Sequence, residues 1–506
     1  MEAGIMSFMR DTITVTLYLV ILFFVAFLVQ TAECHVFQVG PARTYAQPSD
    51  VASLVQNSDT VEIDPGTYTD CATWNKNNLF LMGAGPGYTH LENSVCGQKG
   101  IWVIYGNNET VENIEFSGAS ISQSAGNNGA GIRAQGGSFT IRHCFFHDNQ
   151  DGILSDPDSA GRTVLIEYSI FDNNGAGDGY SHNMYIGSNG AVRYASFTLQ
   201  YCYTHRANIG NNIKSRADRN FILYNRIMDE DAPTSWDIDL PNGGQAFITG
   251  NEIEKGPNAQ QHGTMEFGLE GLSNAPPQNL FIASNTFIND AGRGTYVNIP
   301  SSGVDTLEIV NNIFAGVNQN AMISNMPALL DSVANLVSAS IPSVSLVNAA
   351  GYDYHLAKNS PAVGKGIPPG AADGSSLAPV DEYLDTANMK PRVIVGAIDQ
   401  GAHEYTASND ITEQQFSVSA FGVTVVQNQS SGTLDFYIPI SYIRNIVLSV
   451  FDILGRRIAS YVGTPFSERM NGEKIQLSTS GMKTGIYFAQ IVSPQGTAFV
   501  KYLLIK

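Results

Sequence analysis

A short pattern recurs through the middle of the chain and constrains the fold more than any other feature. Each copy reads apolar, any residue, apolar, two or three polar residues, apolar, as at 139–146 and 307–314. Further copies lie at 164–171, 221–227, 247–253 and 281–287. The polar residue at the bend recurs every 23 to 34 residues, at Cys144, Ser169, Cys202, Asn225, Asn251, Asn285 and Asn312. That spacing is typical of a solenoid.

Stacking of the copies follows from their size. One copy is too short to bury its apolar face alone, so successive copies must pack on one another. The alternation of period two predicts strands rather than helices. Asn at the same bend of several copies predicts an asparagine ladder, in which each amide bonds to the backbone of the next coil. This arrangement resembles the right-handed parallel β-helix, and the resemblance covers residues 36–405.

The composition agrees with an all-β chain and excludes several classes of partner. Hydrophobic residues make up 43% and charged residues 14%, with 49 Gly, which excludes disorder and favours strands and turns. There are 27 Lys and Arg against 46 Asp and Glu, a net charge of -19 that opposes binding to a phosphate backbone. We therefore expect no nucleic-acid partner.

The five cysteines include no CxxC pair, so we expect no cysteine metal or redox centre. Cys71 and Cys96 are candidates for a disulfide near the N-terminal cap. Cys144 and Cys202 occupy equivalent bends and are expected to be buried thiols.

The N-terminal residues have the layout of an export signal. The run 13–29 carries no charge, follows Arg10 and precedes the small-residue pattern Ala32-Glu33-Cys34. We predict a signal peptide over 1–34; a retained membrane anchor is the main alternative, and a lipoprotein is disfavoured by Glu33. The solenoid is expected over 35–405, with a capping helix within 48–56 and closing segments at 353–363 and 396–405.

The last part of the chain reads as a small antiparallel β-sandwich, predicted over 416–506 after a linker at 406–415. IVLSVFDILGRRIASYV (446–462) and LSTSGMKTGIYFAQIVSPQGTAFVKYLLIK (477–506) resemble the C-terminal sorting domain of the type IX secretion system. The usual Pro-Asn-Pro opening is replaced here by a segment beginning at Val426. An ordinary accessory sandwich is the alternative. The resemblance implies the type IX machinery as a partner, and a secreted or outer-surface location in a Gram-negative, Bacteroidetes-like bacterium.

An alignment of successive coils predicts which side chains share the outer face. We take as inward residues Ile186, Ile213, Ile238, Phe267 and Val297. Their neighbours then point outward because side chains alternate along a strand. One outward column reads Tyr185, Asn212, Asp237, Glu266, Tyr296, and the other Gly187, Lys214, Asp239, Gly268, Asn298. The alignment places Lys214 one rung from Asp239.

Basic residues concentrate in the same stretch of this acidic chain. The cluster consists of Arg193, Arg206, Lys214, Arg216, Arg219 and Arg226, with His205 among them. Such a patch suits an anionic polymer, although these residues could instead balance acids such as Asp229 and Asp231. Tyr185, Trp236 and Tyr296 could stack on sugar rings or pack at the solvent edge.

Residues 212–225 and 239–251 resemble the central coils of β-helical polysaccharide lyases of the alginate lyase and chondroitinase B kind. The resemblance implies that Lys214 removes the proton next to a uronate carboxylate and that Ca²⁺ neutralises that carboxylate. The base must be neutral, so we expect burial, Arg216 and the ion to lower the pKa of Lys214. From the alignment, the calcium ligands are Asn212, Asp237 and Glu266.

One residue of the lyase pattern is absent. The arginine of the family falls on Pro241, so its role would pass to Arg216, His182 or His205, or be lost together with the chemistry. His182 has a structural hydrogen-bonding role as its alternative. The residues expected to bind substrate are Arg193, Arg206, Arg219, Tyr185, Trp236, Tyr296 and Asp239.

Two other functions stay open from the sequence. Asp237 and Asp239 could form the carboxylate pair of an inverting glycoside hydrolase, although the N-T-D and G-H-G elements of β-helical polygalacturonases are missing. A non-catalytic glycan-binding adhesin is the other alternative. We predict a monomer that acts on an anionic polysaccharide, most simply by β-elimination.

Overall fold

The computed structural model describes residues 34–188, 190–317 and 322–406. In the C-terminal region it describes 424–428, 433–438, 447–452, 457–462, 473–478, 482, 485–493 and 496–504. Apart from Cys34 and Thr406, the predicted signal peptide and linker lie outside the described residues. In the ranges above, no helix is both long enough and apolar enough to cross a bilayer.

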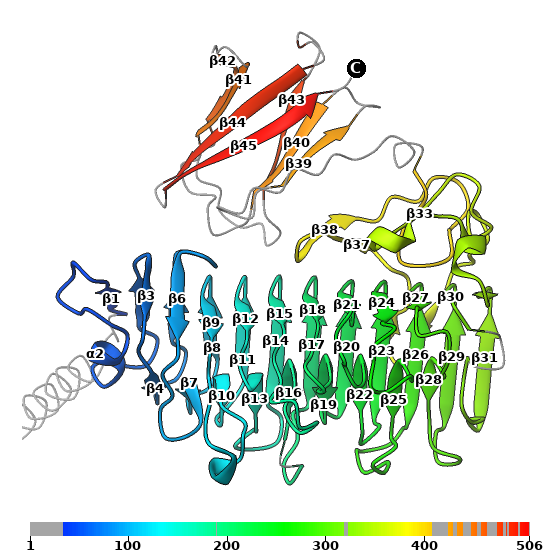
Figure 1. The fold of residues 1–506 in the computed structure, drawn as a ribbon, viewed down its shortest axis with the longest axis horizontal. Helices are drawn as coiled ribbons and strands as arrows, with labels where there is room; N and C mark the ends of the chain where they lie inside the picture. Colours follow the sequence, from blue (N-terminus) through cyan, green and yellow to red (C-terminus); the bar gives the residue numbers. More distant parts are fainter. Residues whose placement is uncertain are drawn as a thin grey trace, which may run out of the picture.

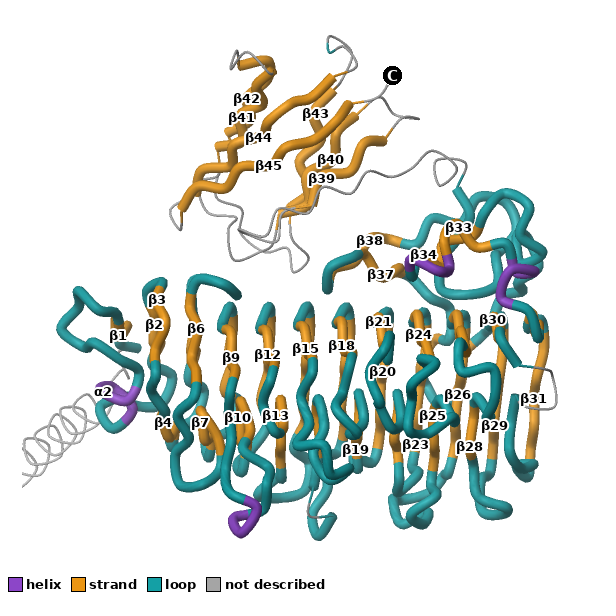
Figure 2. The backbone as a smooth tube through the Cα atoms, in the orientation of Figure 1, coloured by secondary structure: helices purple, strands orange, loops and turns teal. Residues whose placement is uncertain are grey.

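Three parallel sheets, here called A, B and C, build the predicted solenoid (Figures 1 and 2). The chain passes from a strand of A to one of B and one of C, and then returns to A one coil further along. Sheet A contains β1 (Val36–Val39), β2 (Thr60–Ile63), β5 (Phe80–Met82), β8 (Glu109–Glu112), β11 (Phe139–Arg142), β14 (Thr163–Glu167), β17 (Ser196–Gln200), β20 (Arg219–Leu223), β23 (Gln245–Thr249), β26 (Asn279–Ala283), β29 (Thr306–Val310) and β31 (Leu329–Val333). Sheet B contains β3 (Gly66–Tyr68), β6 (Thr89–Glu92), β9 (Glu115–Ser117), β12 (Phe145–His147), β15 (Ile170–Asp172), β18 (Tyr203–His205), β21 (Arg226–Met228), β24 (Glu252–Lys255), β27 (Thr286–Asn289), β30 (Ile313–Ala315) and β32 (Leu336–Ser338). Sheet C contains β4 (Ala72–Trp74), β7 (Gly100–Ile104), β10 (Ala130–Ala134), β13 (Asp151–Ser155), β16 (Met184–Ile186), β19 (Ile213–Ser215), β22 (Ile238–Leu240), β25 (Met265–Phe267) and β28 (Val297–Asn298).

Apolar side chains from all three sheets fill the interior. Equivalent residues of successive coils lie over one another, so like side chains stack along the solenoid. Phe146 stacks on Phe116 and on Phe171, with ring centroids 5.1 and 4.9 Å apart. Each fully buried side chain of this size contributes about 1.5–3 kcal/mol from the hydrophobic effect.

The predicted asparagine ladder is confirmed at the bend between sheets A and B. The backbone N–H of Asn225 donates to Oδ1 of Asn251 (2.8 Å), and that of Asn251 to Oδ1 of Asn285 (2.9 Å). The series continues through Asn312 and Asn335 (2.8 and 2.9 Å). Each side-chain amide from Asn225 to Asn312 also donates to a backbone carbonyl of the preceding coil, such as Asn285 Nδ2 to Ile248 O (2.8 Å). Cys144, Ser169 and Cys202 occupy the same bend in the preceding coils.

The N-terminal end of the solenoid carries the expected cap and disulfide. The helix α2 (Ser49–Ala52) lies within the predicted range and is shorter than it. Cys71 and Cys96 form a disulfide. Cys144 and Cys202 are buried free thiols, as predicted.

A segment that we call the strap (residues 346–405) follows the last coil and packs on the outer faces of sheets A and B. It contains β33 (Leu346–Asn348), β34 (Asp353–Leu356), β35 (Ala371–Ala372), β36 (Ser375–Ser376), β37 (Asp381–Leu384) and β38 (Asn388–Pro391). Within the part of the chain that the structure describes, short 3-10 helices lie at Gln123–Ala125, Ile341–Val344 and Ala349–Gly351. Leu377 of the strap packs on the outward side of sheet A against Phe247 and Phe281. Tyr201 of the solenoid donates to Asp381 Oδ2 (2.8 Å). The strap thus covers outward aromatic residues that would otherwise face water.

Buried charges hold the strap against sheet B. His403 lies between Glu252 of β24 and Glu382 of the strap, and all three side chains are nearly inaccessible to solvent. Burial lowers the pKa of His403, but hydrogen bonds and charge from the two carboxylates outweigh it and raise the pKa to about 9. The imidazolium is therefore the stable form at neutral pH.

The C-terminal strands form the predicted small antiparallel sheets. One contains β39 (Thr424–Asn428), β40 (Thr433–Ile438) and β43 (Glu473–Ser478), and the other β41 (Val447–Asp452), β42 (Arg457–Val462), β44 (Gly485–Ser493) and β45 (Gly496–Leu504). The all-β fold class, a parallel solenoid followed by antiparallel sheets, is confirmed.

The ladder predicts a position-specific loss of stability. In Asn285→Ala the buried N–H of Asn251 loses its acceptor, so we expect the free energy of unfolding to fall by about 2–3 kcal/mol. Urea unfolding followed by circular dichroism measures this. Asn359→Ala, at an exposed position of the strap, is the control; an equal loss in both variants would contradict the assignment.

The His403 cluster predicts a pH dependence of defined sign. Because the folded pKa is raised above the unfolded value of about 6.5, the stabilisation is complete below pH ~6.5 and is lost as the pH rises through about 9. We expect His403→Gln to be less stable than wild type at pH 6, with the difference shrinking toward pH 9.5. Urea midpoints at three pH values test this, with the exposed His35→Gln as control.

Candidate functional site

One outward column of sheet C brings charged and aromatic side chains together. The strand register places Tyr185 opposite Lys214, Lys214 opposite Asp239, and Asp239 opposite Glu266. Asn298 follows on the next strand. We call Tyr185, Lys214, Asp239 and Glu266 the sheet C column.

The predicted contact between Lys214 and Asp239 is confirmed, but the alignment that produced it is wrong in three places. Ile186 lies opposite Ser215 rather than Ile213. Phe267 lies opposite Leu240, and Val297 opposite Met265. Each error is a slip of two residues, which leaves the inward and outward sets of side chains unchanged. Alternation along the sequence therefore cannot detect it.

Two cations and two carboxylates form a closed network at the column. Lys214 Nζ lies 2.7 Å from Asp239 Oδ2 and 2.9 Å from Glu270 Oε1. Arg216 bonds to the other oxygen of Glu270 at 2.6 Å, and its Nε donates to the Tyr185 hydroxyl at 2.8 Å. Lys214 also lies 5.4 Å from the centre of the Tyr185 ring. The network therefore holds two positive groups side by side at the surface.

The expected lowering of the pKa of Lys214 is wrong for this arrangement. Burial alone lowers it, but Asp239 and Glu270 raise it more, and the net pKa lies above the ordinary value. Lys214 is thus an ammonium ion while these carboxylates contact it.

Asp239, Glu266 and Glu270 bring carboxylate oxygens within 4.8 Å of one another. Burial and the neighbouring Asp239 raise the pKa of Glu266 to about 10. Oδ1 of Asp239 is buried and has no hydrogen-bond partner among the described residues. A set of hard oxygen donors with an unused buried oxygen fits Ca²⁺.

Sequence reasoning missed Glu270, which lies on the loop after β25. Its carboxylate is the most exposed member of the network, at 47%. The loop contains Gly268 and Gly271, both with positive φ (76° and 115°), and this backbone returns Glu270 toward Lys214. A rule that considers only strand positions cannot find such a residue.

Asn212 and Asp237 do not join the column, and the predicted calcium set that contains them is wrong in this respect. Both are fully buried. Asn212 Nδ2 donates to Asp237 Oδ1 (3.2 Å), and the other oxygen of Asp237 lies 3.2 Å from Lys255 Nζ. β19 begins at Ile213 and β22 at Ile238, so residues 212 and 237 lie at the preceding bend, where strand alternation does not apply. Asp237 and Asp239 therefore do not form the predicted carboxylate pair. Asp237 contacts Asn212 and Lys255, whereas Asp239 contacts Lys214.

His182 lies beside the column in a buried position. Its Nδ1 accepts a hydrogen bond from the backbone N–H of Asn211 (3.0 Å), and Asn211 Nδ2 donates to Asp239 Oδ2 (2.6 Å). Burial and the cations Lys214 and Arg216 lower the pKa of His182 to about 3. The neutral ring thus supports Asn211, which in turn positions Asp239.

The structure does not bring the predicted basic patch together. Arg206 pairs with Asp172 and His205 with Glu230 on sheet B. Arg219 covers Phe221 on sheet A, with its guanidinium carbon 5.2 Å from the ring centre. Each coil contributes one strand to each of the three sheets. Residues that are close in sequence can therefore point in different directions around the solenoid axis.

The remaining predicted contact residues divide between surface and core. Arg193 donates to Ser273 Oγ (3.0 Å), which also accepts from Asn242, a partner of Arg216. Trp236 is half-buried on the loop before β22, and its backbone N–H donates to Asn211 Oδ1 (3.1 Å). Tyr296 is fully buried in the core. The expected sugar-stacking role of Tyr296 is therefore wrong, whereas Tyr185 lies within the column.

Comparison with known proteins identifies the C-terminal region. Residues 433–506 match the secretion system C-terminal sorting domain. This confirms the sorting-domain resemblance over an ordinary accessory sandwich, and it indicates type IX secretion, typical of secreted or cell-surface proteins of Bacteroidetes. No curated protein matches the chain. A solved structure, ORF18 of Geobacillus virus E2, is similar with a TM-score of 0.29 and 10% identity over 90% of this chain and 72% of that one.

The raised pKa of Glu266 predicts how its replacement changes stability with pH. Because the folded pKa lies above the unfolded one, wild-type stability falls as the pH rises from about 4.5 to about 10, by at most about 1.4 kcal/mol per pH unit. Glu266→Gln removes this term, so we expect the variant to gain stability relative to wild type between pH 5 and 9. Chemical unfolding in chelator at several pH values checks this, with Glu62→Gln on β2 as the control; parallel curves for wild type and Glu266→Gln would contradict it.

Proposed function

We propose that the sheet C column binds an anionic, uronate-containing polysaccharide outside the cell and cleaves it by β-elimination. The observation that carries the proposal is the convergence of Lys214 and Arg216 on the exposed carboxylate of Glu270. The sorting domain supports it, because an exported protein encounters extracellular polymers.

Glu270 marks the position at which a substrate carboxylate would bind. Its two oxygens accept from Lys214 and Arg216, so this position already holds one carboxylate. Its side chain is about half exposed and its loop contains positive-φ glycines. Displacement of Glu270 by a sugar carboxylate would keep Arg216 paired and would release Lys214 from Glu270, while Tyr185 offers an aromatic surface beside them.

The residues that would hold Ca²⁺ are Asp239, Glu266 and Glu270. When bound, the ion supplies positive charge that neutralises the uronate carboxylate and acidifies the adjoining C5 proton. Burial lowers the pKa of Lys214, and Asp239 and Glu270 are the main groups that raise it, with Tyr185 as a further cause. Once those carboxylates have other partners, Lys214 can lose its proton and act as the base.

The elimination step assigns each proton and electron pair. Lys214 Nζ takes the C5 proton, the C5 electron pair forms the C4=C5 double bond, and the C4–O bond breaks. The departing oxygen takes a proton from the Tyr185 hydroxyl, which accepts from Arg216 Nε and so keeps its own hydrogen to donate. All these side chains come from one chain, so a monomer suffices.

Glycoside hydrolysis is a second candidate, favoured by one observation. Glu266 has a pKa of about 10 and is protonated at neutral pH, while Asp239 beside it is paired with Lys214 at 2.7 Å. A protonated and an ionised carboxyl group in one site can serve as acid and base.

Chemical products distinguish these reactions. We expect wild-type protein with Ca²⁺ to release unsaturated uronate, which absorbs in the ultraviolet, from alginate, pectate or chondroitin, and to stop when chelator is added. Lys214→Ala should lower the rate by roughly 100-fold or more. Arg43→Ala, at an exposed position near the cap, should leave it unchanged.

Each other outcome has a defined meaning. New reducing ends without ultraviolet absorbance would replace β-elimination by hydrolysis. Binding without any product would identify a glycan-binding adhesin. Absence of binding to every anionic glycan would refute the proposal.

A further inference from the structure

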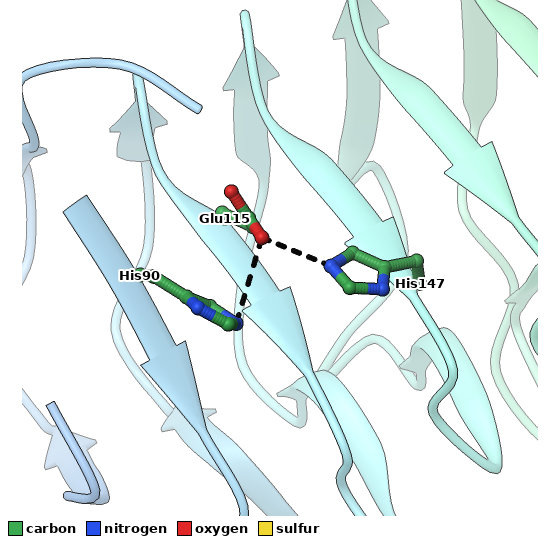
Figure 3. Close-up of side chains that lie close together, drawn as sticks. All are labelled: His90, Glu115 and His147. Carbon is green, nitrogen blue, oxygen red and sulfur yellow. Dashed lines mark hydrogen bonds and ion pairs between the residues drawn. The ribbon is translucent and has the colours of Figure 1, made fainter. Parts of the chain in front are cut away.

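A second cluster of chemically active side chains lies on the outward face of sheet B, near the N-terminal end of the solenoid (Figure 3). His90, Glu115 and His147 come from β6, β9 and β12, which are neighbours in the sheet. His90 lies directly opposite Glu115, and His147 lies two residues further along the next strand. Each side chain is partly exposed, between 13% and 21%.

The three side chains point at one another. Glu115 Oε1 lies 3.0 Å from His147 Nε2 and 3.6 Å from His90 Nε2. Donor atoms of a tetrahedral zinc site, at 2.0–2.2 Å from the metal, are about 3.3 Å apart. The separations observed here bracket that value, so a cation can enter with small side-chain movements.

Neighbouring groups orient two of the three side chains. Asp148 Oδ2 lies 2.7 Å from His147 Nδ1, and its other oxygen accepts from Asn173 Nδ2 (2.6 Å). A carboxylate at Nδ1 places the proton there and leaves Nε2 free to bind a metal, and metal-bound histidines are commonly oriented in this way. Glu115 Oε2 accepts the backbone N–H of Gly87 (2.6 Å), which leaves Oε1 directed to the histidines.

His90 has a partner that a metal would replace. Its Nε2 lies 2.7 Å from the hydroxyl of Ser117. A hydroxyl can rotate, so Ser117 can release this nitrogen without any change in the backbone. The cluster therefore provides two imidazole nitrogens and one carboxylate oxygen.

We propose that His90, Glu115 and His147 form a binding site for one Zn²⁺ ion, with Asp148 as a positioning residue. Imidazole with carboxylate favours zinc and similar transition metals over Ca²⁺. Three protein ligands leave one coordination position open to water or to a ligand atom from outside. The site is independent of the sheet C column, whose clustered carboxylates suit a harder cation.

Calorimetry on the full chain tests the proposal. Chelator-treated protein titrated with ZnCl₂ at pH 7.5 should show one site that is lost in His147→Ala and in Glu115→Gln. Asp148→Asn should bind roughly 10- to 100-fold more weakly. His262→Ala, a histidine of the loop before β25, should bind as wild type, and the urea midpoint of each variant without metal establishes that it is folded.

Cobalt provides a readout that a purely structural ion pair would not give. Co²⁺ should show the intense visible absorption of four-coordinate cobalt in wild type and not in His147→Ala. Failure of the wild-type chain to bind zinc would overturn the proposal. Unchanged binding in both ligand variants, or a weak six-coordinate cobalt spectrum, would also overturn it.

Discussion

The hydrogen bond from a backbone N–H to the asparagine side chain of the next coil is the interaction on which the rest of the structure depends. At the bend between sheets A and B the backbone leaves one strand before entering another, so its N–H has no strand partner. Asn251 and Asn285 supply that partner from within the interior. Because the same bond recurs from coil to coil, every strand that follows the bend begins at the equivalent position around the solenoid axis. The outward columns of sheets B and C therefore come into register.

The same repeated geometry explains what could be predicted from the sequence. The period of the bend residues, the alternation of the strands and the disulfide are all local or periodic signals, and all appear in the structure. The pairing of Lys214 with Asp239 was predicted because the register between β19 and β22 happened to be aligned correctly. Glu270 could not be predicted, since its position depends on a loop whose backbone turns at Gly268 and Gly271.

The errors at the site have two physical origins. A two-residue slip leaves the hydrophobic pattern intact, so the sequence carries no penalty against it, and Glu266 moves beside Asp239 only in the true register. Alternation also stops where a strand stops. Asn212 and Asp237 lie just outside that limit and join Lys255 in the interior. The basic residues scatter for a related reason, since proximity in sequence within a solenoid means proximity along the axis and not on one face.

Because of the strap, the two ends of the solenoid differ in their resistance to a pulling force. The strap's contacts with Tyr201, Phe247 and Glu252 join residues 130 to 180 positions apart in sequence. Contacts between earlier coils join residues much closer in sequence, such as Arg162 and Asn107, which are 55 apart. The strap ends at residue 405, directly before the region that leads to the sorting domain. A pulling force applied from that end would act in shear on several strap contacts at once, before any coil could separate from its neighbour. The β-helix is therefore protected against unravelling from the terminus at which export machinery engages it.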